Sequence, residues 1–343
     1  MRIVVTGAAG FVGSHLCARL LEQGNDVVGI DAVTDFYDVT LKEANLAALA
    51  DWDSFTFHRA DLLDAPLRQL MNGADVVFHL AGQPGVRPSW GRKFDVYAER
   101  NILATQCLLE VSRQVPLRKI VYSSSSSVYG DAESFPTAET VRPRPVSPYG
   151  VTKLAAEHLC ELYRANFGTP TASLRLFTVY GPGQRPDMAF SRLIGAALSG
   201  DPFPLYGDGR QTRDFTYVGD VVTALCAAAA SAWTGVANIG GGSRTSMTEV
   251  LRIVGSLVGR PVETTRMPAQ PGDVKDTAAD IALARQAFGY APATPLAEGL
   301  AHMVKDRIGL AERRWSPHDG IASRDGEAQR PPDMELHQAP NLR

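Results

Sequence analysis

Hydrophobic and polar positions along the first 240 residues form two alternating patterns. Short runs of apolar and β-branched residues are typical of buried strands, and the longer stretches between them repeat their apolar positions with the period of a helix. The patterns predict strands at 2–6, 26–30, 55–59, 74–80, 118–123, 172–177 and 236–239, and helices at 93–113, 149–167 and 217–233. Strands that alternate with helices at this spacing indicate an α/β fold with a doubly wound parallel sheet, which binds its ligands at the carboxyl ends of the strands.

The composition changes after residue 180, and this change divides the predicted fold. Residues 181–214 are rich in Gly, Pro, Arg and Asp, and irregular sequence returns between 240 and 275. Together with helices expected near 246–258 and 295–312, these segments predict a smaller C-terminal lobe that binds the substrate. The predicted division is a larger domain at 1–180 to which 215–239 return, the smaller lobe at 181–214 and 240–317, and a loose polar tail at 318–343.

Length, charge and cysteine usage narrow the classes of function. The chain has 343 residues, of which 45% are hydrophobic, so it can bury a large core. Its formal charge is −3 with no dense basic block, so we expect neither a nucleic-acid partner nor an anionic membrane surface. We also expect no membrane span and no signal peptide, because no 18-residue apolar run or charged-then-apolar leader is found. The widely spaced Cys17, Cys107, Cys160 and Cys226 show no CxxC or metal-ligand spacing, so we expect reduced thiols, no metal and a cytoplasmic protein.

A glycine turn follows the first predicted strand. Gly7, Gly10 and Gly13 are spaced GxxGxxG between that strand and a helical pattern. Glycines suit this place because backbone N–H groups at the helix start must come within hydrogen-bonding distance of a pyrophosphate. Asp31, at the end of the second strand, can accept hydrogen bonds from an adenosine ribose and would repel a 2′-phosphate, which favours NAD over NADP. The alternative for Asp31 is an ordinary polar strand end.

A second chemical signal lies at the start of the helix expected at 149–167. Ser147 is a good N-cap and Pro148 suits the first helical position. Tyr149 and Lys153 then lie one turn apart on one face of the helix. A phenol ionises near pH ~10, and a neighbouring ammonium would lower that pKa so that the tyrosine can act as an acid–base group. A hydroxyl from the serine run at 123–127 could share the proton, which outlines a hydride-transfer site; the alternative is a chance pairing of Tyr and Lys.

Four arginines stand in the irregular start of the predicted smaller lobe. Cations in such loops can bind phosphates or a carboxylate, although each one alone is more often a surface cation. They are Arg185, Arg192, Arg210 and Arg213.

These motifs resemble the extended short-chain dehydrogenase/reductase family and, within it, the nucleotide-sugar 4-epimerases. Residues 7–13 (GAAGFVG) match the family's phosphate loop, 60–64 (ADLLD) its adenine-side acid, and 149–153 (YGVTK) its Tyr-x-x-x-Lys motif. The resemblance implies a Rossmann domain that binds NAD and an isomerase whose catalytic residues are Ser125, Tyr149 and Lys153. The cofactor-binding residues that it implies are Gly7, Gly10, Phe11, Val12, Gly13, Asp31, Asp61, Leu62, Leu80, Ala81, Gln83, Asn101, Tyr149 and Lys153.

Further stretches are similar to those of UDP-glucuronate 4-epimerases. They are 35–43 (DFYDVTLKE), 83–87 (QPGVR), 177–182 (FTVYGP), 185–189 (RPDMA), 213–217 (RDFTY) and 270–274 (QPGDV). Two departures could change the shape of the sugar pocket: Gly82 stands where Ala is more usual, and Gly183-Gln184 replaces Trp-Gly. The substrate-binding residues that this resemblance implies are Arg87, Ser126, Ser127, Thr178, Arg185, Arg192, Arg213 and Asp273.

The implied reaction is epimerisation at C4 of a UDP-sugar, with NAD tightly held and not consumed. Tyr149 removes the 4-hydroxyl proton while C4 gives a hydride to the nicotinamide, Lys153 lowers the pKa of Tyr149 and bonds the nicotinamide ribose, and Ser125 relays the proton. The 4-keto sugar then swings about its diphosphate and takes the hydride back on its other face. Arg213 and Asp273 are the implied residues on the UDP side.

A glucuronate substrate would add a chemical hazard. Oxidation at C4 makes a β-keto acid, which loses CO2 when its carboxylate bond aligns with the carbonyl π system, so an epimerase must hold the carboxylate away from that alignment. Ser126, Ser127, Thr178 and Arg185 are the candidates, and for the two serines the alternative is a turn at a strand end. Related dehydratases and decarboxylases carry an acid in this serine loop, so its absence here argues against dehydration and, to a lesser degree, against decarboxylation.

Three alternatives remain at the level of sequence. The first is a UDP-glucose/UDP-galactose 4-epimerase, in which Arg185 would have no carboxylate partner. The others are a UDP-glucuronate decarboxylase and a dinucleotide-binding protein without turnover, which the intact set of Ser125, Tyr149 and Lys153 disfavours. By resemblance, the helices at 93–113 and 149–167 are expected to pair in a homodimer.

Overall fold

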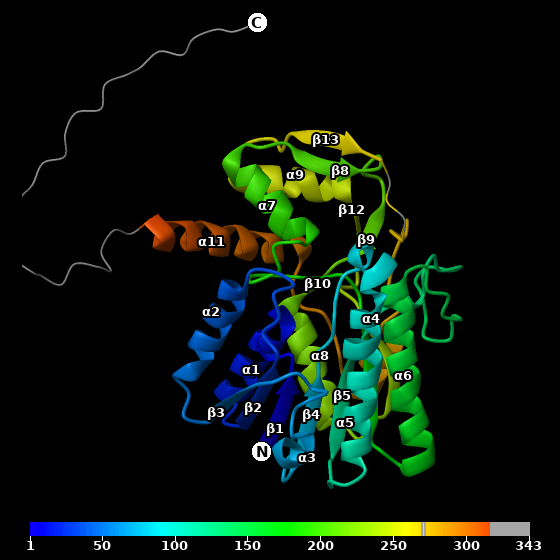
Figure 1. The fold of residues 1–343 in the computed structure, drawn as a ribbon. Coiled ribbons are helices and arrows are strands. Elements are labelled where there is room, and N and C mark those ends of the chain that lie inside the picture. Colours follow the sequence, from blue (N-terminus) through cyan, green and yellow to red (C-terminus); the bar gives the residue numbers. More distant parts are fainter. Residues whose placement is uncertain (269, 271, 316–343) are drawn as a thin grey trace, which may run out of the picture.

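The computed structural model describes residues 1–268, 270 and 272–315, and in this part of the chain seven parallel strands form the central sheet (Figure 1). The strands lie in the order β11, β6, β5, β4, β1, β2, β3. Their bounds are β1 Arg2–Thr6, β2 Asp26–Asp31, β3 Phe55–Arg59, β4 Val76–His79, β5 Lys119–Ser125, β6 Thr171–Leu176 and β11 Gly235–Ile239. The order reverses between β1 and β4, and a doubly wound sheet binds its ligand in the crevice at such a switch point. The predicted α/β class with a Rossmann-like sheet is confirmed.

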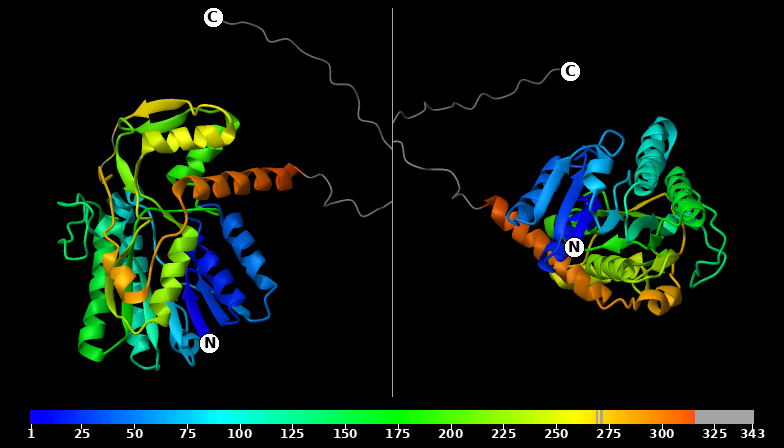
Figure 2. Two further views of the ribbon diagram at one scale, coloured as in Figure 1. Left: turned by 180° about the vertical axis from the view of Figure 1, so that it is seen from behind. Right: turned by 90° about the horizontal axis from the view of Figure 1, so that it is seen from below.

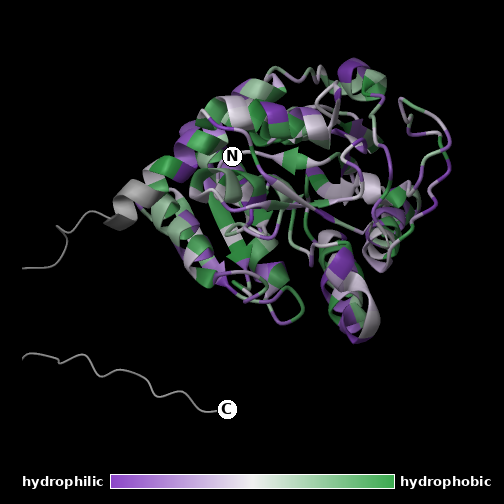
Figure 3. Ribbon diagram, turned by 90° about the horizontal axis from the view of Figure 1, so that it is seen from above, coloured by the Kyte–Doolittle hydropathy of each residue, from purple (hydrophilic) through white to green (hydrophobic). Residues whose placement is uncertain are grey.

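Helices cover both faces of the sheet, which is why its central strands β1 and β4 are largely apolar (Figures 1 and 2). Successive residues of β1 point to opposite sides, so that Val5 packs with one group of helices and Val4 with the other. Figure 3, seen from above, shows hydrophobic strands between helices of mixed character. The helices on the Val5 side are α1 (Phe11–Glu22), α8 (Val218–Ala230) and α10 (Ala282–Phe288), and those on the Val4 side are α3 (Leu67–Met71), α5 (Ala104–Ser112) and α6 (Pro148–Phe167).

A smaller lobe lies over the carboxyl ends of the strands (Figure 1). It has its own apolar core, in which Leu193, Val250 and Leu300 are fully buried. Two short strands, β7 and β10, pair in parallel where the chain passes between the sheet and this lobe. The elements of the lobe and of this crossing are β7 Val179–Tyr180, α7 Ala189–Ser199, β8 Phe203–Tyr206, β9 Thr212–Asp214, β10 Thr216–Tyr217, β12 Arg244–Ser246, α9 Met247–Val258, β13 Thr264–Met267 and α11 Leu296–Trp315.

The helix predicted at 93–113 is the main departure from the sequence pattern. The structure divides it into a 3-10 turn Gly91–Lys93, the short helix α4 (Phe94–Tyr97), a π-helix η3 (Ala98–Leu103) and α5. A π-helix places one extra residue in a turn and occurs often at functional sites. Here it contains Asn101, which is buried.

Other parts of the chain complete the comparison with the predicted elements. Helix α2 (Val39–Ala50) and the short helices α3 and α10 were not predicted, and neither was α7, which lies in the stretch 181–214 that was expected to be irregular. The predicted tail at 318–343 lies outside the described residues. None of the described helices combines the length and the apolar character that a membrane crossing needs.

Candidate active site

The turn between β1 and α1 has a shape that only glycine permits. Gly7 has φ = +75°, and a Cβ on it would lie 2.8 Å from the backbone nitrogen of Ala81. A Cβ on Gly13 would lie 2.0 Å from the carbonyl oxygen of Gly7. Gly10 is the N-cap residue of α1 and has no side chain to cap it, so the amino end of this helix is open to an anionic group. The turn therefore fits a pyrophosphate.

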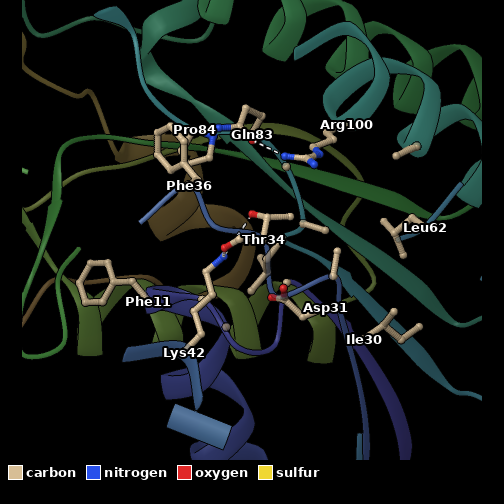
Figure 4. Close-up of a pocket in the computed structure, with 18 of the residues that line it drawn as sticks. Phe11, Ile30, Asp31, Thr34, Phe36, Lys42, Leu62, Gln83, Pro84 and Arg100 are labelled. Carbon is tan, nitrogen blue, oxygen red and sulfur yellow. Dashed lines mark hydrogen bonds between the residues drawn. The ribbon is translucent and has the colours of Figure 1, made fainter. Parts of the chain in front are cut away.

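This turn opens into a cavity of about 220 Å³ at the switch point of the sheet (Figure 4). Every predicted cofactor-binding residue lines the cavity except Asn101, Tyr149 and Lys153. Figure 4 shows the lining side chains converging from the glycine turn, the loop after β2 and the loop after β4. The lining residues that were not singled out from the sequence include Thr34, Phe36, Tyr37, Lys42, Pro84 and Arg100.

Asp31 ends β2 at the wall of this cavity, held by two backbone groups. Its carboxylate accepts hydrogen bonds from the N–H groups of Ala9 (3.1 Å) and Val33 (2.7 Å). Burial raises the pKa of Asp31, while the bond from Val33 and the charge of Lys42 oppose the rise. Val33 has φ = +48°, a left-handed conformation that a β-branched residue rarely adopts, so the backbone is strained beside the carboxylate. Each carboxylate oxygen keeps a lone pair for a ribose hydroxyl.

Two cations in the wall escaped the sequence reasoning because their partners lie on other segments. Lys42, on α2, donates a hydrogen bond to the carbonyl oxygen of Thr34 (2.7 Å). Arg100 donates to the amide oxygen of Gln83 (2.8 Å) and lies 4.0 Å from the carboxylate of Asp61. The only sequence feature that included Lys42 was the DFYDVTLKE stretch, and this stretch was used only to support the family resemblance.

Tyr149 and Lys153 lie on the first turns of α6, as the N-cap signal predicted. The Ser147 hydroxyl accepts a hydrogen bond from the N–H of Gly150 (3.1 Å), which begins the helix. The Tyr149 N–H donates to the hydroxyl of Ser89 (3.1 Å), and its ring meets that of Tyr97 edge-on with centroids 6.3 Å apart. These two contacts hold the backbone and the ring of Tyr149 at the start of α6.

The electrostatics of Tyr149 differ from the sequence-based expectation. Burial raises its pKa, and the contributions that lower it come from a hydrogen bond with Ser125 and from the charge of Arg185. Burial lowers the pKa of Lys153 to about 8, and its ammonium lies 4.4 Å from the centre of the Tyr122 ring. In this structure the groups that lower the pKa of Tyr149 are Ser125 and Arg185, and the lowering by Lys153 stays a prediction.

The side chain of Asn101 forms its hydrogen bonds within the protein. Its amide oxygen accepts a hydrogen bond from the N–H of Gln83 (2.6 Å). Its amide nitrogen donates to the carbonyl oxygen of Gln83 (3.1 Å) and to the hydroxyl of Thr152 (2.9 Å). Asn101 thus joins the cavity loop at Gln83 to α6 at Thr152, and its predicted binding of the cofactor stays a prediction.

The serine loop lies at the end of β5. The Ser125 hydroxyl accepts a hydrogen bond from the N–H of Ser127 (3.1 Å), which fixes its oxygen. Ser126 and Ser127 form a 3-10 turn with Val128 and are half-buried. Thr178 follows β6, is half-buried, and accepts a hydrogen bond at its carbonyl oxygen from Thr216 (3.0 Å).

Arg185 comes from the loop between β7 and α7 and lines the cavity. Its Nε and Nη2 donate to the two carboxylate oxygens of Asp187 at 3.0 and 2.9 Å. The loop itself is held by Gln184, whose amide nitrogen donates to the carbonyl oxygen of Val179 (3.0 Å) and whose amide oxygen accepts from the N–H of Ser191 (3.1 Å). A guanidinium has five N–H groups, so the pair with Asp187 leaves three for another ligand.

The remaining predicted substrate residues contact one another or the backbone. Arg87 and Asp273 form an ion pair at 2.6 Å, and the Arg87 guanidinium lies 4.2 Å from the centre of the Tyr206 ring. Arg213 donates to the carbonyl oxygens of Thr212, Lys275 and Val274, at 2.9, 2.9 and 2.5 Å. Arg192 is exposed on α7. The structure thus brings Arg87 and Asp273 together across 186 positions of sequence, while Arg213 holds a backbone segment.

Comparisons with known proteins agree with this geometry. Residues 3–240 match the model of the NAD dependent epimerase/dehydratase family. An uncharacterized UDP-glucose epimerase, YtcB, of Bacillus subtilis is 45% identical over 307 residues, which span 89% of this chain and 97% of YtcB. A probable UDP-glucuronate 4-epimerase of Rhizobium meliloti is 35% identical over 329 residues, 89% of this chain and 96% of its own. The crystal structure of the UDP-glucuronic acid 4-epimerase of Bacillus cereus, in complex with UDP-glucuronic acid and NAD, is similar with a TM-score of 0.88 at 44% identity, covering 90% of this chain and 100% of that one.

Proposed function

Because this chain belongs to the NAD-dependent epimerase/dehydratase family, we propose that it is a nucleotide-sugar 4-epimerase that interconverts UDP-glucuronate and UDP-galacturonate. The observation that carries the choice of sugar is Arg185, a cation that lines the cavity and whose charge acts on Tyr149. In a glucuronate, the carboxylate is bonded to the carbon next to C4. A sugar that places C4 beside Tyr149 and its carboxylate beside Arg185 therefore fits this site.

The residues of the cavity fit a resident NAD. The turn that a Cβ on Gly7 or Gly13 would fill suits a pyrophosphate, and Asp31 suits an adenosine ribose. Lys153, on the helix that closes this region, suits the second ribose. When bound, NAD supplies a reversible acceptor for the hydride of C4. We assign the cofactor to the larger domain of the predicted division and the UDP-sugar to the smaller lobe.

Tyr149 and Ser125 transfer the proton of the 4-hydroxyl. Tyr149 accepts this proton as the hydroxyl carbon is oxidised and returns it when the sugar is reduced on its other face. Ser125, fixed by the N–H of Ser127, hydrogen-bonds the phenol and passes the proton between phenol and sugar. The positive charges of Lys153 and Arg185 stabilise the phenolate that forms between the two steps.

The carboxylate of the 4-keto intermediate must be held. In this β-keto acid, the bond from C5 to the carboxyl carbon breaks to release CO2 when it stands parallel to the carbonyl π system. Arg185 can pair with the carboxylate through its three remaining N–H groups, while Asp187 holds its opposite edge. Ser126, Ser127 and Thr178 lie at strand ends from which their hydroxyls can bond the same group.

A second substrate has its own support. The relative YtcB carries the name of a UDP-glucose epimerase, and UDP-glucose differs from UDP-glucuronate only at C6, which is a hydroxymethyl group in place of the carboxylate. The proton chemistry of Tyr149 and Ser125 would be unchanged, and Arg185 would keep Asp187 as its partner without a substrate carboxylate.

The assembly that we propose is a homodimer in the cytoplasm. Large apolar side chains are exposed on the helices at 94–112 and on α6, and a second copy of the chain would cover them: Phe94, Leu103, Val151 and Leu162 are 40%, 50%, 46% and 54% exposed. The four cysteines are free in the structure, as a reducing compartment requires.

The test is incubation of the purified protein with UDP-glucuronate, with and without added NAD, followed by proton NMR of the sugar. UDP-galacturonate that approaches a fixed ratio without net NADH establishes the reaction. Release of CO2 and formation of a pentose would show that Arg185 and the serine loop do not protect the keto acid. Turnover of UDP-glucose alone would move the function to the second substrate.

A further inference from the structure

One buried carboxylate lies beneath the catalytic residues and is not part of the proton chemistry. Glu157 is 1% exposed and stands on α6, one turn after Lys153 and two turns after Tyr149. Its Oε2 accepts a hydrogen bond from the hydroxyl of Ser124 (2.7 Å), the residue that precedes Ser125 on β5. The three catalytic side chains therefore come from two elements that Glu157 joins.

The same carboxylate is joined to a third element. Arg175, on β6, donates from Nε and Nη2 to the two oxygens of Glu157, at 2.9 and 2.6 Å. Ser124 and Arg175 are direct partners in the register of β5 and β6, so both reach the carboxylate from adjacent strands. The Nη1 of Arg175 donates to the hydroxyl of Tyr129 (2.7 Å), which in turn donates to Asn238 on β11 (2.8 Å).

We propose that Glu157 is a positioning residue, which fixes the end of β5 against α6 and so sets the distance between Ser125 and the pair Tyr149 and Lys153. A buried ion pair is costly to desolvate, and apolar residues of similar volume fill such a place at no loss of stability. A buried ion pair at this position is explained if it holds the geometry of the site to within a fraction of an ångström. A displacement of about 1 Å in an active site reduces turnover by about 100-fold.

Glu157 also acts on the charge of Lys153. The groups that face the Lys153 ammonium are Glu157 and Cys160 on α6, the Tyr122 ring on β5, and His79 on β4, whose own pKa the Lys153 charge lowers. Burial lowers the pKa of Lys153, and Cys160 and Glu157 raise it. Removing the negative charge of Glu157 therefore lets this pKa fall further, and Lys153 loses its proton at a lower pH.

The experiment compares Glu157→Gln with Glu161→Gln in the NAD-loaded enzyme. Glu161 lies on the same helix and pairs with Arg164 at 2.9 Å, but the side chains of that pair are 29% and 39% exposed, so it controls for loss of an ion pair on α6. Each variant is assayed for kcat, KM and the pH dependence of kcat on the substrate that the wild type turns over. For Glu157→Gln we expect kcat to fall 10- to 100-fold with KM within about threefold, and the alkaline limb to move to lower pH. Glu161→Gln should match the wild type.

A double variant keeps the test decisive if the single one does not fold. Glu157→Gln with Arg175→Gln removes the stranded charge, and it should bind NAD and keep both the low kcat and the shifted limb. The proposal is overturned if the folded double variant has the wild-type kcat and pH profile, or if Glu161→Gln gives the same changes. It rests on the catalytic assignment of Tyr149 but not on the sugar. Retained activity in Tyr149→Phe would refute the proposed function itself, whatever Glu157 does.

Discussion

Two arginine–carboxylate pairs in this protein have the same geometry and different surroundings. Arg175 and Arg185 each donate from Nε and Nη2 to both oxygens of one carboxylate, Glu157 and Asp187. The side chains of the first pair are 6% and 2% exposed, and those of the second are 16% and 44% exposed. In the first pair the remaining nitrogen of the arginine is taken by Tyr129. In the second pair, Arg185 lines the cavity and has three N–H groups that do not bond Asp187.

The difference in burial between the two pairs separates two roles within one site. The buried pair lies under the chemistry that every substrate of this site would share, and each of its groups is bonded inside the protein. Under the proposed function, the half-exposed pair lies where substrates differ, and Arg185 keeps N–H groups that can bind a ligand. The predictions below test this separation.

The largest effect is expected when one partner of the buried pair is removed. Arg175→Met leaves the Glu157 carboxylate buried and unpaired, which lowers the free energy of unfolding by about 3–5 kcal/mol. Arg185→Met breaks the half-exposed pair and should cost less than about 1 kcal/mol. Chemical denaturation of both variants with equal NAD content measures the contrast. Equal losses would mean that burial does not distinguish the two pairs.

The second effect concerns substrates. Arg185→Ala removes a charged hydrogen-bonding partner of a carboxylate, worth about 1.5–3 kcal/mol, so kcat/KM for UDP-glucuronate should fall about 10- to 150-fold. Turnover of UDP-glucose, if the wild type supports it, should change by no more than about threefold. Steady-state kinetics with the two sugars provide the measurement. A parallel loss on both sugars would place Arg185 in the shared machinery.

The third effect is a pH dependence that only the buried region should show. His79 is 1% exposed, and burial lowers its pKa from 6.5 to about 3. Between these values the unfolded chain binds a proton that the folded chain does not, so its contribution to stability is complete above pH 6.5 and falls by about 1.4 kcal/mol per pH unit below it. In His79→Asn this slope should be absent from unfolding curves measured between pH 6.5 and 5. An unchanged slope would assign the acid sensitivity to other groups.

The smallest effect tests how tightly the buried region is packed. A Cβ on Gly82 would lie 2.8 Å from the amide oxygen of Asn101, so Gly82→Ala must shift that side chain and should cost about 1 kcal/mol. Because Asn101 connects the cavity loop to α6, the NAD content of the purified protein should fall slightly as well. Thermal unfolding and the absorbance of bound cofactor provide the two measurements. An unaltered melting temperature would show that the Asn101 side chain can move without loss of stability.

Sequence reasoning succeeded where a local pattern dictates structure. The glycine turn before α1, the carboxylate at the end of β2, and the N-cap that starts α6 were all predicted, because each depends on residues close together in the chain. Binding roles inferred for the cavity residues stay predictions, since the structure places them at the cavity without a ligand.

It failed where the partner lies far along the chain. Arg175 meets Glu157 across 18 positions, and Arg87 meets Asp273 across 186, which no periodicity reveals. The π-helix that buries Asn101 adds a residue to a turn that a regular 3.6-residue pattern cannot show. Sequence patterns thus predicted the scaffold but not the long-range contacts that hold the side chains of the site.

The loop between β7 and α7 is attached in a way that bears on how this fold changes its specificity. The side-chain amide of Gln184 forms hydrogen bonds with Val179 before the loop and with Ser191 after it. One side chain therefore joins the two ends of the segment. Segments with such closed ends can be exchanged between relatives as units, because their internal bonds travel with them. Under the proposed function, replacing the residues of this loop around Arg185 would change the sugar that the site accepts, while the proton chemistry of Tyr149 and Ser125 stays as it is.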